Sequence, residues 1–477
     1  MASPLTAFGS VALPKDIPLS QTASRGPTLP MRGGPKVGVG PVVEKASPGE
    51  KWMAFLLGLG TRLQVQVIGF LPFTEIFLLL AFPLYLPRIQ SSGAMRRTGW
   101  CVPLLFVWIA SQIMSDVYRE TQWSLAARGF ARGVIFLIAI PFFTWFLRKG
   151  CYDKVLWWTI GTLPSFALSA YIFRGGVHEG RELVYGTAEI KYDTHWGGVL
   201  GIAVAIISLL VYQRSRILCY LVNGGLGAFH VANAMRATGA LTILSTVVTA
   251  GLNVVRGPKR SPLFAKRIAS WKLATVAAAA VVAGYGVATW YGHAARLGQF
   301  GERARVKYES QVRNRFGLLA GGRPEFVGGL LAISESPFVG YGSWPLDQSY
   351  VFSRACEIMQ VKLDPNYYKR GYPLIPSHSH ILGAWVEAGV LGIFFFFYIF
   401  CVAARAVYLP IRDEKRLRFW LVSTSLLLLW AILFSPISAR LETSFLLGAI
   451  FNQVVFSRAG LMGVLGDGAP VATRRAA

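Results

Sequence analysis

Charged residues are scarce in this chain of 477 residues. Asp, Glu, Lys and Arg make up 15% of the sequence, whereas a typical soluble domain carries about 25%. Acidic residues are the scarcer kind, which leaves a net charge of +25. Because the basic residues stand between long apolar runs, this charge indicates a polytopic membrane protein and argues against a nucleic-acid-binding protein. The composition therefore excludes an ordinary water-soluble enzyme.

Paired cysteines and nucleotide-binding glycine loops are also lacking. The five cysteines include no Cys-x-x-Cys pair and are odd in number, so we expect neither a disulfide framework nor a zinc site. No Walker-type phosphate loop is present, which argues against ATP-driven work. Of the six histidines only His378 and His380 are close together, and their spacing does not place both on one helix face. We therefore predict no metal and no cofactor.

Long apolar stretches recur from residue 52 onward. Each is long enough to cross about 30 Å of hydrocarbon, and only helices or closed barrels satisfy the backbone there. The sequence therefore predicts an all-α membrane bundle of about twelve transmembrane helices. The predicted spans are 52–70, 73–88, 99–115, 129–147, 154–173, 196–213, 217–235, 238–255, 271–291, 381–403, 418–435 and 441–457. The first pair contains several polar residues, so 52–88 could also be one crossing and an interfacial helix.

The distribution of basic residues predicts the orientation of the bundle. The stretch 256–267 carries five basic residues and no acid, and such loops stay in the cytoplasm. The predicted parts are a disordered cytoplasmic tail at 1–51, an N-terminal bundle at 52–291, a large non-cytoplasmic loop at 292–379, C-terminal helices at 380–457 and a cytoplasmic tail at 458–477. The large loop holds more basic than acidic residues. It is either a solvated lid or a surface for an anionic ligand.

Residues 377–392 read Ser-His-Ser-His-Ile-Leu-Gly-Ala-Trp-Val-Glu-Ala-Gly-Val-Leu-Gly. We expect His378 and Ser379 at the entrance of a helix, and Glu387 about 13 Å deeper. An ionisable residue at that depth indicates a functional site, and a neutral imidazole is a natural proton acceptor. On its own, His378 would more often be a solvated residue that caps the helix.

Four arginines occupy the predicted outer side. Arg323 precedes the turn Pro337-Phe-Val-Gly-Tyr-Gly342, and Arg236 lies in a tight turn between two spans. Arg128 and Arg132 stand one helical turn apart at an outer helix end. Any of the four alone would more often anchor the protein to lipid headgroups.

Together these stretches resemble the O-antigen ligase and polymerase family of bacterial membrane glycosyltransferases. The C-terminal signature of that family is an Arg, then Pro-x-x-Gly-x-Gly, then His-Asn-x-x-Leu-x-x-x-x-Glu-x-Gly-x-x-Gly. The residues that match in order are Arg323, Pro337, Gly340, Gly342, His378, Leu382, Glu387, Gly389 and Gly392. Ser379 stands where the family usually has Asn, and Met235 replaces the usual Ser before Arg236.

The resemblance implies a GT-C-like helical fold in the bacterial inner membrane, with the active site facing the periplasm. The protein would transfer a glycan from undecaprenyl diphosphate to a sugar acceptor. Arg236 and Arg323 would hold the diphosphate, and His378 would orient or deprotonate the acceptor hydroxyl. His380 would point about 200° away around a helix, toward lipid or a neighbouring span. No metal or nucleotide is required, because the lipid diphosphate is itself the activated donor.

The remaining candidates would contact the substrate around this centre. They are Arg128, Arg132, Ser379, Glu387, Gly340 and Gly342. Two activities share the implied chemistry: a polymerase of lipid-linked repeat units, and a ligase that joins the glycan to lipid A-core. We favour the polymerase slightly, for lack of a core-binding feature. A lipid-linked oligosaccharide transporter is the alternative from another class, and it should carry charged residues inside several helices.

Overall fold

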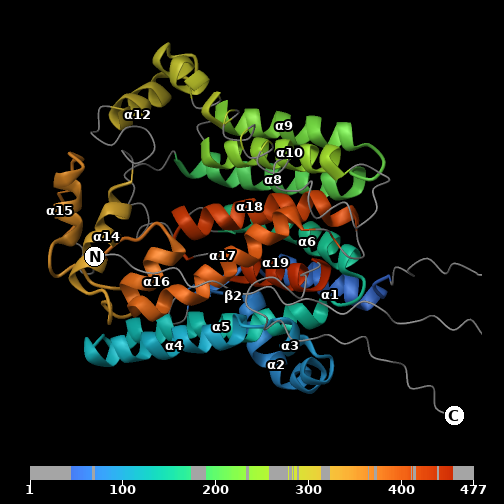
Figure 1. Ribbon diagram of the computed structural model, residues 1–477, viewed down its shortest axis with the longest axis horizontal. Coiled ribbons are helices and arrows are strands. Elements are labelled where there is room, and N and C mark those ends of the chain that lie inside the picture. Colours follow the sequence, from blue (N-terminus) through green and yellow to red (C-terminus); the bar gives the residue numbers. More distant parts are fainter. Residues whose placement is uncertain are drawn as a thin grey trace, which may run out of the picture. The chain divides into compact units, whose positions relative to one another are not determined.

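The computed structural model describes the greater part of the chain. The described residues are 45–66, 70–172, 190–232, 236–256, 275, 278, 282, 284–286, 289–312, 323–363, 365–369, 373–409, 411, 415–437 and 440–454. Within them the protein is mostly helical (Figure 1). The predicted C-terminal tail at 458–477 and most of the predicted span 271–291 lie outside the described residues.

The helices and strands follow in chain order. The first part contains α1 (Pro48–Leu59), β1 (Gln64–Gln66), β2 (Phe70–Pro72), α2 (Phe73–Ser91), α3 (Ala94–Arg97), α4 (Cys101–Tyr118), α5 (Trp123–Phe146) and α6 (Cys151–Ile172). The middle part contains α8 (Ile190–Val211), α9 (Arg216–Ala232), α10 (Arg236–Arg256), α12 (Glu302–Val312), α14 (Pro324–Glu335) and α15 (Val351–Ile358). The last part contains α16 (His380–Ala388), η1 (Val390–Gly392), α17 (Ile393–Tyr408), η2 (Lys415–Leu417), α18 (Arg418–Phe434) and α19 (Arg440–Gln453).

Five of the described helices are long and apolar enough to cross a membrane. Their apolar segments are Cys101–Tyr118, Trp123–Phe146, Ala237–Val254, Val390–Tyr408 and Lys415–Phe434. All five overlap predicted spans, which supports a helical membrane protein as the fold class. The number of twelve crossings stays a prediction.

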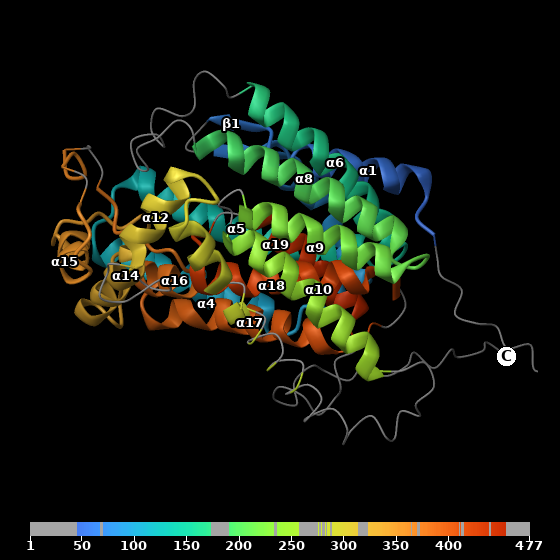
Figure 2. The same cartoon turned by 90° about the horizontal axis from the view of Figure 1, so that it is seen from above.

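The helices pack in a continuous sequence of neighbours. The α4–α5 pair contacts α17, which contacts α18, and α18 in turn contacts α8 and α10 (Figure 1). Seen from above, α1, α6 and α8 lie side by side (Figure 2). Aromatic rings fill the main core: Trp108 stacks on Phe395 at 5.5 Å, and Trp158 stacks on Phe445 at 4.1 Å. Close packing of this kind is what holds helices together in lipid.

The predicted first span, 52–70, is wrong as a continuous helix. Helix α1 starts earlier, at Pro48, behind a capping box formed by Ser47 and Glu50, and it ends at Leu59. The predicted disordered tail at 1–51 therefore overlaps the start of α1, and its residues 1–44 lie outside the described part. The polar residues after α1 pair instead as the antiparallel strands β1 and β2. A helix of 12 residues is too short to cross alone, because a span needs about 20.

The predicted span 381–403 is also divided in the structure. Helix α16 ends at Ala388, and Gly389 has a φ of 68°, a left-handed conformation that favours glycine. A side chain at Gly389 would overlap the carbonyl oxygen of Phe338. The chain then continues through η1 into α17. The apolar run in the sequence therefore covers two helices, with a glycine break between them.

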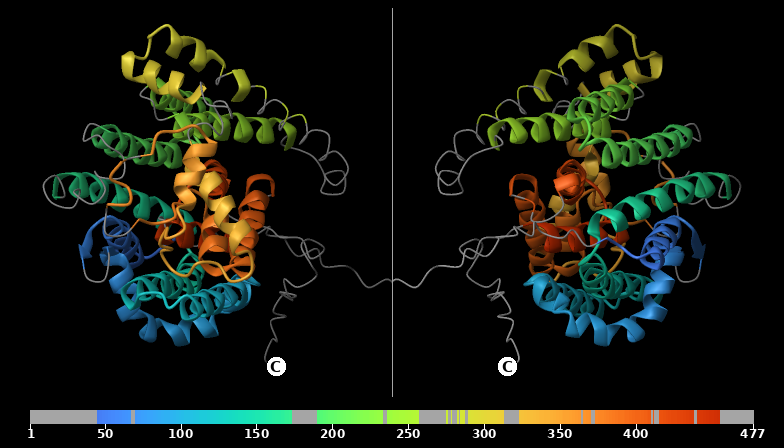
Figure 3. Two further views of the ribbon diagram at one scale, coloured as in Figure 1. Left: turned by 90° about the vertical axis from the view of Figure 1, so that its left-hand side faces the viewer. Right: turned by 90° about the vertical axis from the view of Figure 1, so that its right-hand side faces the viewer.

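The predicted loop at 292–379 contains three described helices. Residues 289–312 include α12, and their ribbon lies next to α9 and α10 (Figure 3). Tyr291 and Tyr308 form one buried hydrophobic cluster with Val231 at the end of α9. Helix α14 contacts both α15 and α16. This segment thus places the start of α14 against the start of α16, where the predicted catalytic residues lie.

Candidate functional site

Arg323 lies at the start of α14, against the end of α18. Its Nη1 donates to the carbonyl oxygen of Phe434 at 3.3 Å. The guanidinium also lies over the rings of Trp430 and Phe434, 5.1 and 4.8 Å from their centroids, a geometry that favours a cation. Burial lowers the pKa of Arg323, and the carboxylate of Glu325 partly offsets this effect. The arginine is therefore held in one place while part of it stays accessible.

His378 faces the same helix start. Its Nδ1 lies 3.4 Å from Oε2 of Glu325, and the two side chains are 25% and 17% exposed. The adjacent Ser379 caps α16, since its hydroxyl accepts from the backbone N–H of Leu382 at 3.1 Å and donates to the carbonyl of Ile432 at 2.9 Å. These bonds fix the backbone beside His378, whose ring is left at the junction of α14 and α16. We call Arg323, Glu325 and His378 the entrance cluster.

His380 has different surroundings from His378. It is 3% exposed, its Nε2 lies 3.2 Å from the carbonyl oxygen of Pro436, and its ring meets Phe396 edge-on at 5.5 Å. The predicted separation of about 200° assumed that both histidines belong to one helix. In the structure His378 precedes the cap, and α16 begins at His380. The two imidazoles nevertheless face different neighbours. The His380 ring faces Pro436 and Phe396, whereas the His378 ring faces Glu325.

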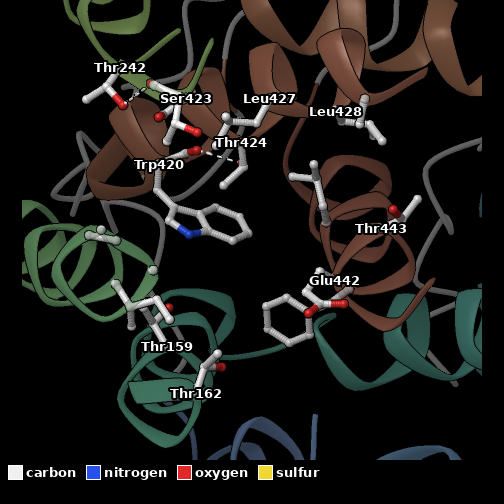
Figure 4. Close-up of a pocket in the computed structure, with 18 of the residues that line it drawn as sticks. Thr159, Thr162, Thr242, Trp420, Ser423, Thr424, Leu427, Leu428, Glu442 and Thr443 are labelled. Carbon is white, nitrogen blue, oxygen red and sulfur yellow. Dashed lines mark hydrogen bonds between the residues drawn. The ribbon is translucent and has the colours of Figure 1, made fainter. Parts of the chain in front are cut away.

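A cavity of about 580 Å³ reaches His380 at the start of α16. Its walls come from α6, α8, α9, α10, α18 and α19, and they are largely apolar. Figure 4 shows the indole of Trp420 projecting into this space, with Thr159 and Thr162 on one side of it. Residues Arg62, Asn223, His230, Thr242, Thr424 and Glu442 contribute further polar groups to the lining.

Four of the six threonines of this lining donate their hydroxyl protons to carbonyl groups of their own helices. Thr159 donates to Val155 at 2.7 Å and Thr162 donates to Trp158 at 2.9 Å. Thr242 and Thr424 bond in the same way, to the carbonyls four residues before them. Each hydroxyl therefore offers the cavity only an acceptor. A wall of this kind suits a mostly apolar ligand.

The cavity and the entrance cluster are connected through the end of α18. Ser435 and Pro436 line the cavity, and His380 does so as well. The preceding residue, Phe434, accepts the hydrogen bond from Arg323. The partner of Arg323 is thus adjacent in the chain to a residue of the cavity wall, although no member of the entrance cluster lines the cavity itself.

Arg236 is the first residue of α10, and its side chain lies outside the described part of the chain. Two residues on, Thr238 lines the cavity. Helix α10 runs antiparallel to α18, because Val248 and Leu252 near its end pack on Val422 near the start of α18. The start of α10 therefore lies toward the same end of the cavity as the entrance cluster.

Arg132 is not at a lipid-facing position, which corrects the headgroup-anchor interpretation. Nη1 and Nη2 of its guanidinium donate to the carboxylate of Glu387, and the side chains of Arg132 and Glu387 are 6% and 10% exposed. Gln112 donates to Glu387 Oε2 at 3.1 Å, and Trp108 lies 5.5 Å from the guanidinium. Its predicted companion, Arg128, is exposed instead. Arg132 and Glu387 thus neutralise each other inside the protein.

The two glycines of the Pro-x-x-Gly-x-Gly turn lie against the end of α16. Gly340 and Gly342 have φ values of 80° and 81°. The backbone N–H of Gly342 donates to the carbonyl of Glu387 at 3.0 Å, and that of Tyr341 donates to Val386 at 2.7 Å. A side chain at Gly340 would lie 2.6 Å from the N of Gly389. The glycines permit this close backbone contact, and a contact with substrate stays a prediction.

The structure therefore divides seven of the nine predicted site residues into two groups, and Arg128 and Arg236 belong to neither. Arg323, His378 and Ser379 are together at the entrance, whereas Arg132, Glu387, Gly340 and Gly342 belong to a buried scaffold near the other end of α16. Sequence reasoning missed Glu325, although its position two residues after Arg323 and at a helix start was a usable signal. Among the described residues no group of His, Cys, Asp and Glu could hold a metal ion.

We compared the chain with protein-family models, with curated proteins and with solved structures, and none of them matches it.

Proposed function

We propose that this protein is a membrane glycosyltransferase that moves a glycan from undecaprenyl diphosphate to a sugar acceptor, as a surface-polysaccharide polymerase. One observation carries the proposal: Arg323 bonds to Phe434, and His378 is two residues from His380, so an arginine and a histidine lie next to residues that line or adjoin a largely apolar cavity. A lipid diphosphate needs a cationic site next to an apolar one. The motif resemblance described above supplies the identity of the donor.

In this mechanism the arginines act on the diphosphate. Arg323 would bind its oxygens through charge-assisted hydrogen bonds, and Arg236 would approach from the start of α10. As the bond between the anomeric carbon and the diphosphate oxygen breaks, negative charge accumulates on the leaving group. A preorganised guanidinium stabilises that charge without reorganising.

His378 would act on the acceptor. The acceptor hydroxyl oxygen attacks the anomeric carbon, its proton passes to the imidazole, and undecaprenyl diphosphate leaves. A general base of this kind contributes typically about 10²–10⁴ in rate. His378 suits the role because it stays partly exposed at the entrance, at 25%, whereas His380 is buried at 3%.

The direct test uses purified protein in lipid nanodiscs with an undecaprenyl-diphosphate-linked glycan. We expect release of undecaprenyl diphosphate when a second lipid-linked repeat unit is supplied as acceptor. A reaction only with lipid A-core would identify the ligase instead. Arg323→Ala should abolish release, and Arg323→Lys should restore part of it, because lysine keeps the charge without the bidentate geometry. Full activity of Arg323→Ala would overturn the proposal.

A lipid-linked oligosaccharide transporter is the second candidate, and two observations favour it. The helix break at Gly389 and the buried Arg132–Glu387 pair are features found at the binding sites of transporters. A transporter would move the labelled lipid across a proteoliposome bilayer without cleaving it. Movement with no release of undecaprenyl diphosphate would select this candidate over the transferase.

A further inference from the structure

Glu325 is an acid that two of the three predicted catalytic residues, Arg323 and His378, share. It lies in the first turn of α14, two residues after Arg323, and its Oε2 is 3.4 Å from Nδ1 of His378. Its carboxylate also acts electrostatically on Arg323. The start of a helix favours a carboxylate, because the backbone N–H groups there are unpaired and the helix dipole is positive. Glu325 therefore stands between Arg323 and His378 at the start of α14.

The backbone on both sides of this contact is fixed. Pro324 occupies the first position of α14, and the N–H of Phe326 donates to the carbonyl of Arg323 at 3.1 Å. On the other side, Ser379 is held by its hydrogen bonds to the backbone of Leu382 in α16 and of Ile432 in α18. The Glu325 carboxylate therefore reaches Nδ1 of His378, at 3.4 Å, from a backbone that is held in place. A carboxylate in this position can orient the imidazole ring.

We propose that Glu325 is a positioning residue that holds the Nδ1–H of His378 and so presents the unprotonated Nε2 to the acceptor hydroxyl. This inference rests on the proposed function. An imidazole exists as two neutral tautomers, and the bond made by one nitrogen decides which nitrogen carries the proton. A base oriented by a third group is a recurrent arrangement in enzymes that activate hydroxyls. Glu325 would supply that third group.

The first test reads the tautomer directly and needs no substrate. In protein labelled with ¹⁵N-histidine, the His378 signals are assigned by their loss in His378→Ala. We expect the Nδ1–H tautomer to predominate in the unmodified protein and to lose that predominance in Glu325→Ala. Glu335→Gln is the matched control, since this acid is on the same helix but pairs with Arg354. Unchanged His378 signals in Glu325→Ala would overturn the proposal.

The second test separates positioning from folding. Glu325→Gln should lower kcat about tenfold to a hundredfold, a part of the general-base contribution. The KM for the lipid-linked donor should stay the same or fall, because a negative charge beside the diphosphate is removed. Glu325→Asp should recover part of kcat. A rise in KM with kcat unchanged would show that Glu325 serves binding and would contradict the positioning role.

The outcomes for the two proposals are distinguishable. If the unmodified protein transfers no glycan, the proposed function fails, while the ¹⁵N signals still decide whether Glu325 sets the tautomer. If it transfers glycan and Glu325→Gln retains full kcat, the positioning role fails alone.

Discussion

The two ends of helix α16 have opposite characters. At its C-terminal end, Glu387 is paired with Arg132 and bonded by Gln112, and its carbonyl accepts from Gly342. At its N-terminal end, His378 keeps a quarter of its side chain exposed beside a carboxylate. One sequence motif spans both ends. The comparison teaches that one motif can combine residues that are buried and paired inside the fold with residues that stay partly exposed.

The largest effect should come from the scaffold end. In Gly389→Ala, the added methyl overlaps the carbonyl of Phe338, at a backbone conformation that alanine rarely adopts. We expect a loss of more than about 3 kcal/mol, enough to prevent folding. Gly224→Ala is the control, since its added methyl would meet nothing within 4 Å. Size-exclusion profiles in detergent measure the result, and a normal profile for Gly389→Ala would break the comparison.

A second change tests the buried ion pair. Arg132→Ala leaves Glu387 buried without its partner, which typically costs about 3–5 kcal/mol. Adding Glu387→Gln should recover a large part of that loss, because an amide carries no charge that would be left buried and unpaired. Thermal unfolding of the two single variants and the double variant measures the coupling. Additive losses would show that Arg132 and Glu387 do not act as a pair.

The entrance end should respond in activity and little in stability. His378→Ala should reduce transfer about 10²–10⁴-fold, the usual contribution of a general base, with little change in Tm. His380→Ala removes a ring that is 3% exposed, so its Tm should fall while the folded fraction retains most activity. The combination of turnover and Tm separates the two histidines. An inactive His380→Ala with an active His378→Ala would reverse the assignment.

The smallest expected effect concerns a pH-dependent contact in the α14–α15 segment. Burial alone would raise the pKa of Glu335, but hydrogen bonds from Arg354 and Tyr341 lower it overall. A depressed carboxyl pKa adds stability above its unfolded value and loses it as the pH falls through the folded value. Glu335→Gln should therefore lower Tm by about 1–2 °C at pH 7. The difference in Tm between Glu335→Gln and the unmodified protein should vanish at pH values below the usual carboxyl pKa range. A Tm difference that persists there would exclude this linkage.

Hydropathy predicted the long apolar helices well and their interruptions poorly. The spans 99–115 and 129–147 correspond to α4 and α5 within a few residues at most ends. The break at Gly389 was not predicted, because apolar residues continue on both sides of it. A single glycine does not reveal that its φ is positive. Composition therefore predicts that a segment is buried, but not where its backbone turns.

Contacts within the candidate site were less predictable. The pairing of Arg132 with Glu387 joins residues far apart in sequence, so helical spacing could only relate Arg132 to Arg128. The resemblance to a family singled out Arg323 and His378, and the structure brings them to one junction. Glu325 was missed because an acid at a helix start has an ordinary local explanation. The structure adds the contact between Glu325 of α14 and His378 at the start of α16.

The threonines along the cavity have a consequence for turnover. Because Thr159, Thr162, Thr242 and Thr424 donate to their own helices, they impose no fixed register on a chain lying against them. A long isoprenoid in this space could slide lengthwise without breaking hydrogen bonds to these residues. Under the proposed function, the position of such a tail along the cavity would be set by its charged headgroup. Burial of the tail would still hold the carrier in place, so exchange of spent carrier for a new one would depend on both the diphosphate and the length of the tail.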